Sequence, residues 1–246
     1  MTKRRIRPFA ALKAVRALLA DPEDTRQVFL ITEALNGNSG MREFERFRRS
    51  PVGAAVLRER RALLDVLRDQ ARLSILPDGT LGRSYYDFMS SEGLTADGLV
   101  EASAPERHEQ MPDDVRIFAE RGRDSHDLQH ALTGYGRDGL GEVCLLAFYC
   151  AQSWNPGLLL IVVAGMFKVK KEIPSQPVFR AVREAWRNGR KAAWFSGLDW
   201  EDLLGQQLDT IRQRHFIRPP DIYRGILAWF DARRPADADA PRLAAE

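Results

Sequence analysis

The stretch from Ser125 to Gln152 reads SHDLQHALTGYGRDGLGEVCLLAFYCAQ, and it determines how we interpret the rest of the chain. Its first and last parts both have helical spacing, and the segment from Gly134 to Gly141 between them contains four glycines in eight residues. Glycine adopts backbone conformations that end helices and allow the chain to turn back. The stretch therefore predicts two adjacent helices joined by a glycine-rich loop.

The two predicted helices carry four side chains that can bind one metal ion. His126 and His130 are four residues apart, so both imidazoles lie on the same face of a helix. Asp127 follows His126, and Glu142 opens the helical run after the glycines. Two imidazoles and two carboxylates suit zinc, and also iron, manganese or cobalt. We therefore predict a divalent metal site made of His126, Asp127, His130 and Glu142.

Other interpretations of these residues remain open at this point. Asp127 can orient an imidazole by a hydrogen bond instead of binding the metal itself. Without a metal, HDLQH would be the solvated polar face of an ordinary amphipathic helix, and Glu142 would gain from the helix dipole alone. If a metal binds, the sequence does not decide whether it is structural or catalytic.

Helical periodicity extends over most of the chain. After the loop, Val143, Leu146, Ala147 and Cys150 form the apolar stripe expected of a core helix. The two-residue alternation of strands is hard to find, and there is no fixed-period repeat or evident linker. We therefore predict an all-α fold with a single helical domain over residues 1–234. Residues 235–246, rich in Pro, Ala and Asp, are expected to be disordered.

Several helix limits are marked by particular residues. The spacing predicts a basic amphipathic helix over residues 9–20 and a break at Ser50-Pro51 in the helical region from Met41 to Leu73. Trp154 to Gly157 should end the helix that follows the glycine loop. Asp113 and Asp199 are each predicted to cap the helix that begins after them.

Composition indicates a globular protein that does not bind nucleic acid. The chain has 246 residues, of which 44% are hydrophobic and 29% charged, and its net charge is only +3. The two cysteines, Cys144 and Cys150, are six residues apart and are expected to be buried thiols in a reducing compartment.

The apolar run from Gly157 to Phe167 is too short to cross a bilayer. It fits a buried helix, a strand or the wall of a site for an apolar ligand. The basic N-terminal segment has Lys13 and Arg16 inside its apolar region, which argues against a secretory signal. We therefore predict a cytoplasmic protein.

The sequence resembles a known family at several motifs. His126, Asp127 and His130, followed eleven residues later by Glu142, match the HDxxH-x11-E motif of the coenzyme Q (ubiquinone) biosynthesis Coq-four family. The segment LPDGTLGR at 76–83, with Tyr85 and Phe88 after it, is similar to the family's LPxGxLGRxYxxF segment. The residues WRNGRK at 186–191 resemble its late WxxGR-type helix.

The resemblance implies a bacterial member of a helical family that acts late in ubiquinone synthesis. In that family the motif binds a divalent metal, usually zinc, and an apolar channel receives a polyprenyl tail. The implied chemistry is removal of the ring carboxyl group of a polyprenylated hydroxybenzoate-type intermediate with hydroxylation of the same carbon. Implied partners are other ubiquinone biosynthesis enzymes and a membrane surface, such as the inner face of the plasma membrane, and a homodimer is a further expectation. Gly157 to Phe167 is a candidate surface for the tail.

The charges of the site indicate which residues could contact the substrate. Two carboxylates leave a divalent ion formally neutral, so an anionic ring would need a nearby cation. Arg83 and Arg137 are the candidates, with Tyr85 as a further contact.

The main alternative to this enzymatic function is a non-catalytic lipid-binding scaffold with a structural metal. A more distant one is an HD-type phosphohydrolase, for which only His108 and His215 are left as additional imidazole ligands.

Overall fold

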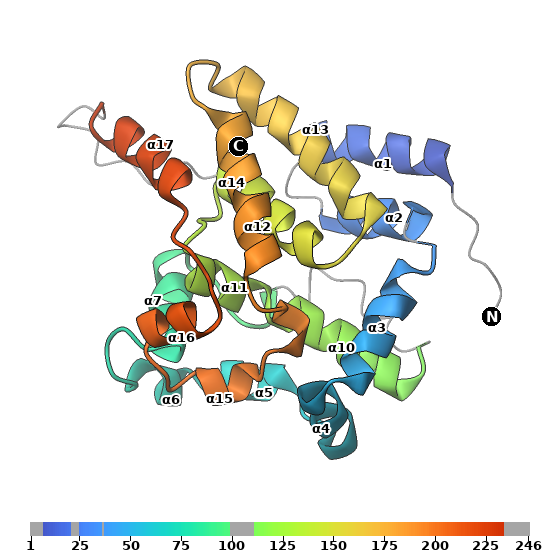
Figure 1. Ribbon diagram of the computed structural model, residues 1–246, viewed down its shortest axis with the longest axis vertical. Helices are drawn as coiled ribbons and strands as arrows, with labels where there is room; N and C mark the ends of the chain where they lie inside the picture. The colour runs from blue at the N-terminus through green and yellow to red at the C-terminus, as the bar shows by residue number, and fades with distance from the viewer. Residues whose placement is uncertain (1–6, 21–24, 36, 99–110, 234–246) are drawn as a thin grey trace. The chain divides into compact units, whose positions relative to one another are not determined.

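The computed structural model describes residues 7–20, 25–35, 37–98 and 111–233. These described ranges form 15 α-helices and one short 3-10 helix, and they contain no strand (Figure 1). Thr80 and Gln207 make an isolated antiparallel bridge. The predicted all-α fold is confirmed.

The chain divides into two compact units, and each draws on separate parts of the sequence. The first consists of residues 1–37, 133–191 and 218–246, and the second of residues 38–132 and 192–217. The predicted domain limits, 1–234, stay a prediction, and the tail expected to be disordered falls outside the described residues.

The first unit is built around α12, a helix that is buried along most of its length. Its helices are α1 (Pro8–Ala20), α2 (Thr25–Leu35), α12 (Gly139–Gln152), α13 (Pro156–Glu172), α14 (Val178–Lys191) and α17 (Asp221–Asp231). α12 packs against α13 and α14, and α13 also packs against α1 and α2. The side chains of Ala14, Val15, Ile31 and Ile161 form one buried cluster of this unit.

The second unit contains shorter helices. They are α3 (Ser39–Arg49), α4 (Pro51–Glu59), α5 (Leu63–Leu67), α6 (Gln70–Ser74), α7 (Leu81–Ser91), α10 (Asp113–Asp124), α11 (His126–Thr133), η1 (Phe195–Gly197), α15 (Trp200–Leu203) and α16 (Leu208–Arg214). Phe47, Val56 and Ile117 form a buried cluster in which α3, α4 and α10 meet.

Most of the predicted helix limits are confirmed. Residues 9–20 lie in α1, and α12 ends before the break at Trp154 to Gly157. At the predicted break between α3 and α4, the Ser50 hydroxyl accepts a hydrogen bond from Gly53 N at 3.0 Å and donates one to Phe47 O at 2.7 Å. Both buried cysteines are free thiols, as expected.

The two predicted aspartate caps are wrong in detail. Asp113 is the first residue of α10 and follows the cap residue Pro112, and its carboxylate accepts hydrogen bonds from Arg60 and Arg116. Asp199 does precede α15, but its side chain makes no capping hydrogen bond and instead pairs with Arg61 at 3.0 Å. A guanidinium group is a stronger partner for a carboxylate than a backbone amide, which explains both differences.

None of the described helices combines the length and the apolar composition that crossing a bilayer requires. The apolar run at 157–167 lies within α13. Ile161 and Val162 are buried on one side of this helix, whereas Val163 and Phe167 are exposed on another.

Gly189 is required because α14 and α12 approach each other closely there. A Cβ atom on Gly189 would lie 2.1 Å from the backbone oxygen of Phe148. Gly225, on α17, has no atom within 4 Å of the corresponding position. We predict that Gly189→Ala lowers the free energy of unfolding by about 1–3 kcal/mol or more, through overpacking. Gly225→Ala should raise it by up to about 1 kcal/mol, since alanine favours a helix.

Urea unfolding followed by circular dichroism measures both glycine variants under the same conditions. The two substitutions are chemically identical and both sites are helical. The difference between their effects on the free energy of unfolding therefore reports the space around each residue. Equal effects of the two substitutions would contradict the close contact at Gly189.

Candidate metal centre

Helix α11 places the two histidines as the spacing predicts. Their rings lie with centroids 4.7 Å apart at an interplanar angle of 73°. His130 is only 1% exposed, whereas about a third of the His126 side chain is exposed to solvent. The pair therefore presents one ring from the interior and one that solvent can reach.

His130 is held against an aromatic ring from α7. The Phe88 ring stacks on the imidazole with centroids 5.7 Å apart and an interplanar angle of 16°. One turn earlier on α7, Tyr85 is fully buried. Burial, together with the negative charges of Asp127 and Asp124, raises the pKa of its hydroxyl well above the ordinary value. Tyr85 therefore keeps its proton at neutral pH and can donate a hydrogen bond.

Asp127 is buried and faces His126. Its Oδ1 atom lies 3.3 Å from His126 Nδ1, a distance compatible with a hydrogen bond to the imidazole. A carboxylate in this position fixes the orientation and tautomer of a metal-binding imidazole. The geometry thus favours the orienting role for Asp127 over direct metal binding.

Glu142 lies in the first turn of α12, and the preceding residues fix where this helix begins. The loop is shorter than predicted, because α12 already starts at Gly139 and Asp138 is its cap. Asp138 Oδ1 accepts hydrogen bonds from Leu140 N and Gly141 N, each at 3.1 Å. Gly134 has a φ of +79°, a conformation that glycine adopts readily.

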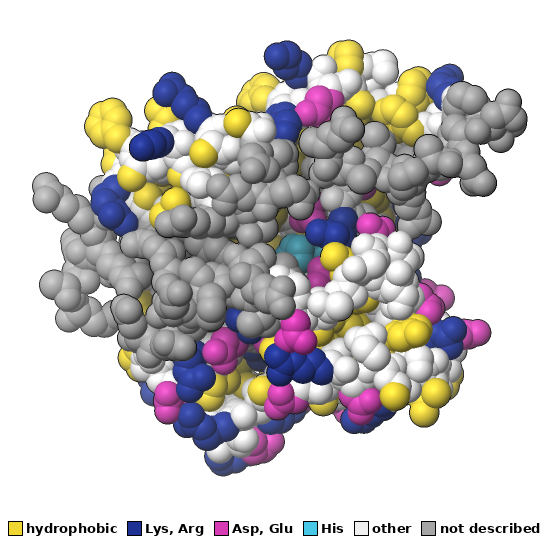
Figure 2. Space-filling model, turned by 180° about the vertical axis from the view of Figure 1, so that it is seen from behind, with side chains coloured by type: hydrophobic (Ala, Val, Ile, Leu, Met, Phe, Trp, Pro, Cys, Tyr) yellow, Lys and Arg dark blue, Asp and Glu magenta, His cyan; other side chains and the backbone are white. Residues whose placement is uncertain are grey.

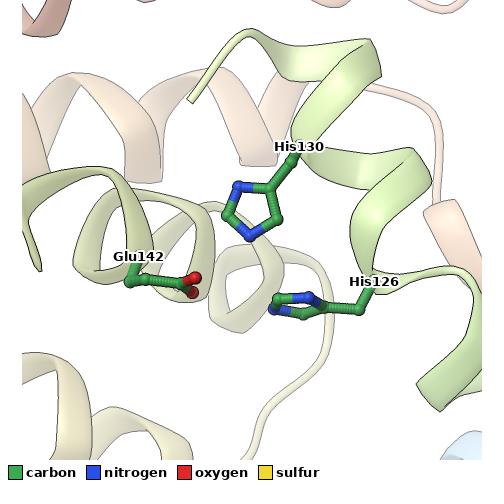
Figure 3. A group of neighbouring side chains, drawn as sticks. All are labelled: His126, His130 and Glu142. Atoms are coloured by element: carbon green, nitrogen blue, oxygen red, sulfur yellow. The ribbon is translucent and has the colours of Figure 1, made fainter. Parts of the chain in front are cut away.

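One group of potential metal ligands is found among the described residues of this motif. His126, His130 and Glu142 each offer one ligand atom, and these atoms all lie within 4.8 Å of one another (Figure 3). Two imidazole nitrogens and one carboxylate oxygen fit zinc, and also iron, manganese or cobalt. The donor set is therefore suitable for the predicted divalent metal.

The two predicted substrate arginines differ in their surroundings. Arg83 Nε donates to Asp87 Oδ1 at 2.9 Å, and Arg83 Nη1 lies 3.2 Å from Asp78 Oδ1 and donates to the Ser74 carbonyl at 3.1 Å. Its charge is therefore balanced by two carboxylates. Arg137 is exposed in the loop before α12.

The sequence did not identify Arg212 as part of this region. Its guanidinium group donates hydrogen bonds to the carbonyl oxygens of Leu132, at 2.9 Å, and Ala131, at 3.3 Å. These carbonyls belong to the last turn of the histidine helix, where a cation is favourable. No local pattern signals this contact, since Arg212 lies 80 residues from Leu132 in the sequence.

Comparisons with known proteins agree on one family. The model of the family described as coenzyme Q (ubiquinone) biosynthesis protein Coq4 matches residues 5–221. The chain is 28% identical over 208 residues to the Danio rerio ubiquinone biosynthesis protein COQ4 homolog, mitochondrial, and the match covers 84% of this chain and 74% of the relative. The human protein of the same name is 28% identical over 179 residues, which are 73% of this chain and 66% of that protein.

A solved structure has the same fold. It is the crystal structure of a protein from Nostoc punctiforme described as a candidate ubiquinone biosynthesis protein, and it matches with a TM-score of 0.64. The match covers 87% of this chain and 99% of the other at 22% identity, so it bears on the fold alone.

Proposed function

This chain belongs to the family of coenzyme Q (ubiquinone) biosynthesis protein Coq4, and from this membership we propose that it is a metal-dependent enzyme of ubiquinone biosynthesis. The proposed reaction replaces the ring carboxyl group of a polyprenylated hydroxybenzoate-type intermediate by a hydroxyl group. The bond between the ring and the carboxyl carbon breaks, and that carbon leaves as carbon dioxide. One molecule each of oxygen and water is consumed, and oxygen takes the two electrons that the ring carbon loses and is released as hydrogen peroxide. The observation that carries the proposal is the set of His126, His130 and Glu142, whose ligand atoms lie within 4.8 Å of one another.

In this proposal the three side chains hold a divalent ion, with Asp127 orienting His126. Zinc is the first candidate, and iron, manganese and cobalt are the alternatives. When bound, such an ion polarises an oxygen atom of the substrate or of a water molecule. Phe88 would restrict the rotation of His130 by stacking on its ring. The buried Tyr85 would supply a protonated hydroxyl for hydrogen bonding.

Arg137 is the preferred partner for the anionic ring of the substrate. An incoming carboxylate or phenolate needs a cation whose charge is available, and Arg83 is already paired with Asp87 and Asp78. If Arg137→Ala and Arg83→Ala both leave substrate affinity unchanged, neither arginine contacts the ring.

The polyprenyl tail requires an apolar surface, and α13 offers one. Phe167 is 60% exposed, and its ring contacts that of Phe179 on α14 with centroids 5.6 Å apart. Lysines at the end of α13, among them Lys168 and Lys171, would suit the anionic headgroups of a membrane. On the face that Figure 2 shows, exposed hydrophobic side chains lie among charged side chains of both signs. We propose that the α13 surface with Phe167 meets the tail at a membrane.

The reaction is tested with the purified full chain, loaded with each of the four metals, under aerobic conditions. A polyprenylated hydroxybenzoate is supplied in detergent, and the ring product is identified by mass spectrometry together with released carbon dioxide. We expect turnover with the wild type and at least a hundredfold less with Glu142→Ala, as is typical when a metal ligand is removed.

The same experiment distinguishes the remaining alternatives. If the metal-loaded wild type binds the prenylated substrate but forms no product, the chain is a lipid-binding scaffold with a structural metal. Cleavage of a phosphate ester would instead identify a hydrolase of the HD type, an interpretation that family membership does not support.

A further inference from the structure

We propose that Tyr223 is a positioning residue for the metal site, because its hydroxyl fixes the loop from which the Glu142 helix starts. The inference rests on the metal role in the proposed function. It concerns a residue that lies 81 positions after Glu142 and outside every motif of the sequence.

The Tyr223 hydroxyl makes two hydrogen bonds to the loop. It donates to Asp138 Oδ2, and it accepts from Gly136 N at 2.9 Å. Burial, together with the negative charge of Asp138, raises the pKa of Tyr223 well above the ordinary value, so the hydroxyl keeps its proton. One group therefore joins both sides of the turn that precedes α12.

Asp138 transmits this constraint to the start of α12. While Oδ2 accepts from Tyr223, Oδ1 accepts from Leu140 N and Gly141 N. The backbone carbonyl of Asp138 accepts from Glu142 N at 2.9 Å. The first turn of the helix, and with it the Cα position of Glu142, is thus tied directly to the residue that Tyr223 holds.

Close packing leaves little freedom for the loop to adopt another path. A Cβ atom on Gly141 would lie 2.0 Å from the carbonyl oxygen of Gly136, so the loop lies directly on the first turn of α12. A Cβ atom on Gly136 would lie 2.6 Å from the Tyr223 hydroxyl oxygen. Bulkier residues at either position would separate these groups.

Tyr223 is itself anchored independently of the loop hydrogen bonds. Its ring is 1% exposed and contacts the ring of Tyr135 with centroids 5.5 Å apart. The neighbouring Ile222 N donates to Glu184 Oε2 on α14 at 2.9 Å. The start of α17 is therefore a fixed support from which the hydroxyl reaches the loop.

The test is Tyr223→Phe, which removes the hydroxyl and keeps the ring. Cobalt alone is titrated into the metal-free full chain, and binding is followed by the visible absorption of the bound ion. We expect the cobalt affinity to be about tenfold weaker and the absorption band to change. An effect of this size is typical when a residue that orients a metal ligand is removed. Tyr86→Phe, the same deletion on α7, is the control and should bind cobalt like the wild type.

Thermal unfolding separates metal binding from folding, because affinities are compared at a temperature where every variant is fully folded. If Tyr223→Phe does not fold, Asp138→Asn decides instead. An asparagine caps a helix well, but its single acceptor oxygen cannot serve both the helix start and the tyrosine. About tenfold weaker binding again supports the proposal.

Two results overturn the inference in different ways. If folded Tyr223→Phe binds cobalt with wild-type affinity, Tyr223 does not position the site, and the metal site itself stays supported. The same conclusion follows from wild-type affinity in Asp138→Asn if Tyr223→Phe does not fold. If the wild type binds no cobalt, the metal proposal and this inference fail together.

Discussion

We expect zinc affinity to fall by at least a hundredfold when Glu142 is replaced by alanine, and competition with a chelating indicator measures this loss. Structural zinc sites with four ligands bind with about 10–16 kcal/mol, so the share of one ligand is roughly 3 kcal/mol, which corresponds to a factor of more than a hundred. Glu142 supplies the carboxylate of a cluster whose other donors are the rings of His126 and His130. The remaining imidazoles alone form an incomplete site.

Two further variants make this measurement specific. Glu172→Ala removes a carboxylate from the exposed end of α13, where its Oε1 atom lies 4.0 Å from Lys168 Nζ, and should leave zinc affinity unchanged. Asp127→Asn distinguishes an orienting residue from a ligand. Because we assign Asp127 an orienting role, we expect this variant to bind zinc about 10–100-fold more weakly than the wild type. An affinity in Glu142→Ala equal to that of the wild type would refute the proposed ligand set.

The histidine helix and the Glu142 helix were predictable because their signals are local. Residues four apart share a helix face whatever the rest of the chain does, so the placement of His126 beside His130 follows from spacing alone. The glycines at 134–141 correctly predicted a break between α11 and α12. They did not show that Asp138 caps α12 and that Gly139 and Gly141 already lie in its first turn.

The remaining contacts depend on side chains that are distant in the sequence. From the sequence, Arg83 was a candidate for binding the anionic substrate ring. The structure shows that it forms ion pairs with Asp78 and Asp87. Arg212 and Tyr223 support the two motif helices from positions that carry no pattern of their own. Tertiary packing decides which of many arginines and tyrosines reaches a given carbonyl or carboxylate, and a single sequence does not contain that information.

The second large effect is expected at a buried ion pair in the second unit. Arg121 on α10 has a side chain that is only 4% exposed, and its two terminal nitrogens bind the two oxygens of Glu201, each at 2.6 Å. Arg121 Nη2 also donates to the Leu198 carbonyl at 3.3 Å. Arg61 lies nearby, with Nη1 4.0 Å from Glu201 Oε2.

We predict that Glu201→Gln lowers the free energy of unfolding by about 3–5 kcal/mol, because it leaves the Arg121 charge buried without its carboxylate. The double variant Arg121→Met with Glu201→Leu should regain most of this loss, since it removes both charges and keeps apolar volume. Urea unfolding of the metal-free chain measures both.

An exposed pair provides the control for this prediction. Arg68 and Asp97 form an ion pair at the surface, where water solvates each charge after the other is removed, so Asp97→Asn should barely change the unfolding midpoint. If Glu201→Gln has as small an effect as Asp97→Asn, solvent must reach Arg121 in a way that its burial does not indicate. If instead the double variant is as unstable as Glu201→Gln alone, the loss comes from packing around α10 and α15, and the buried charge is not its cause.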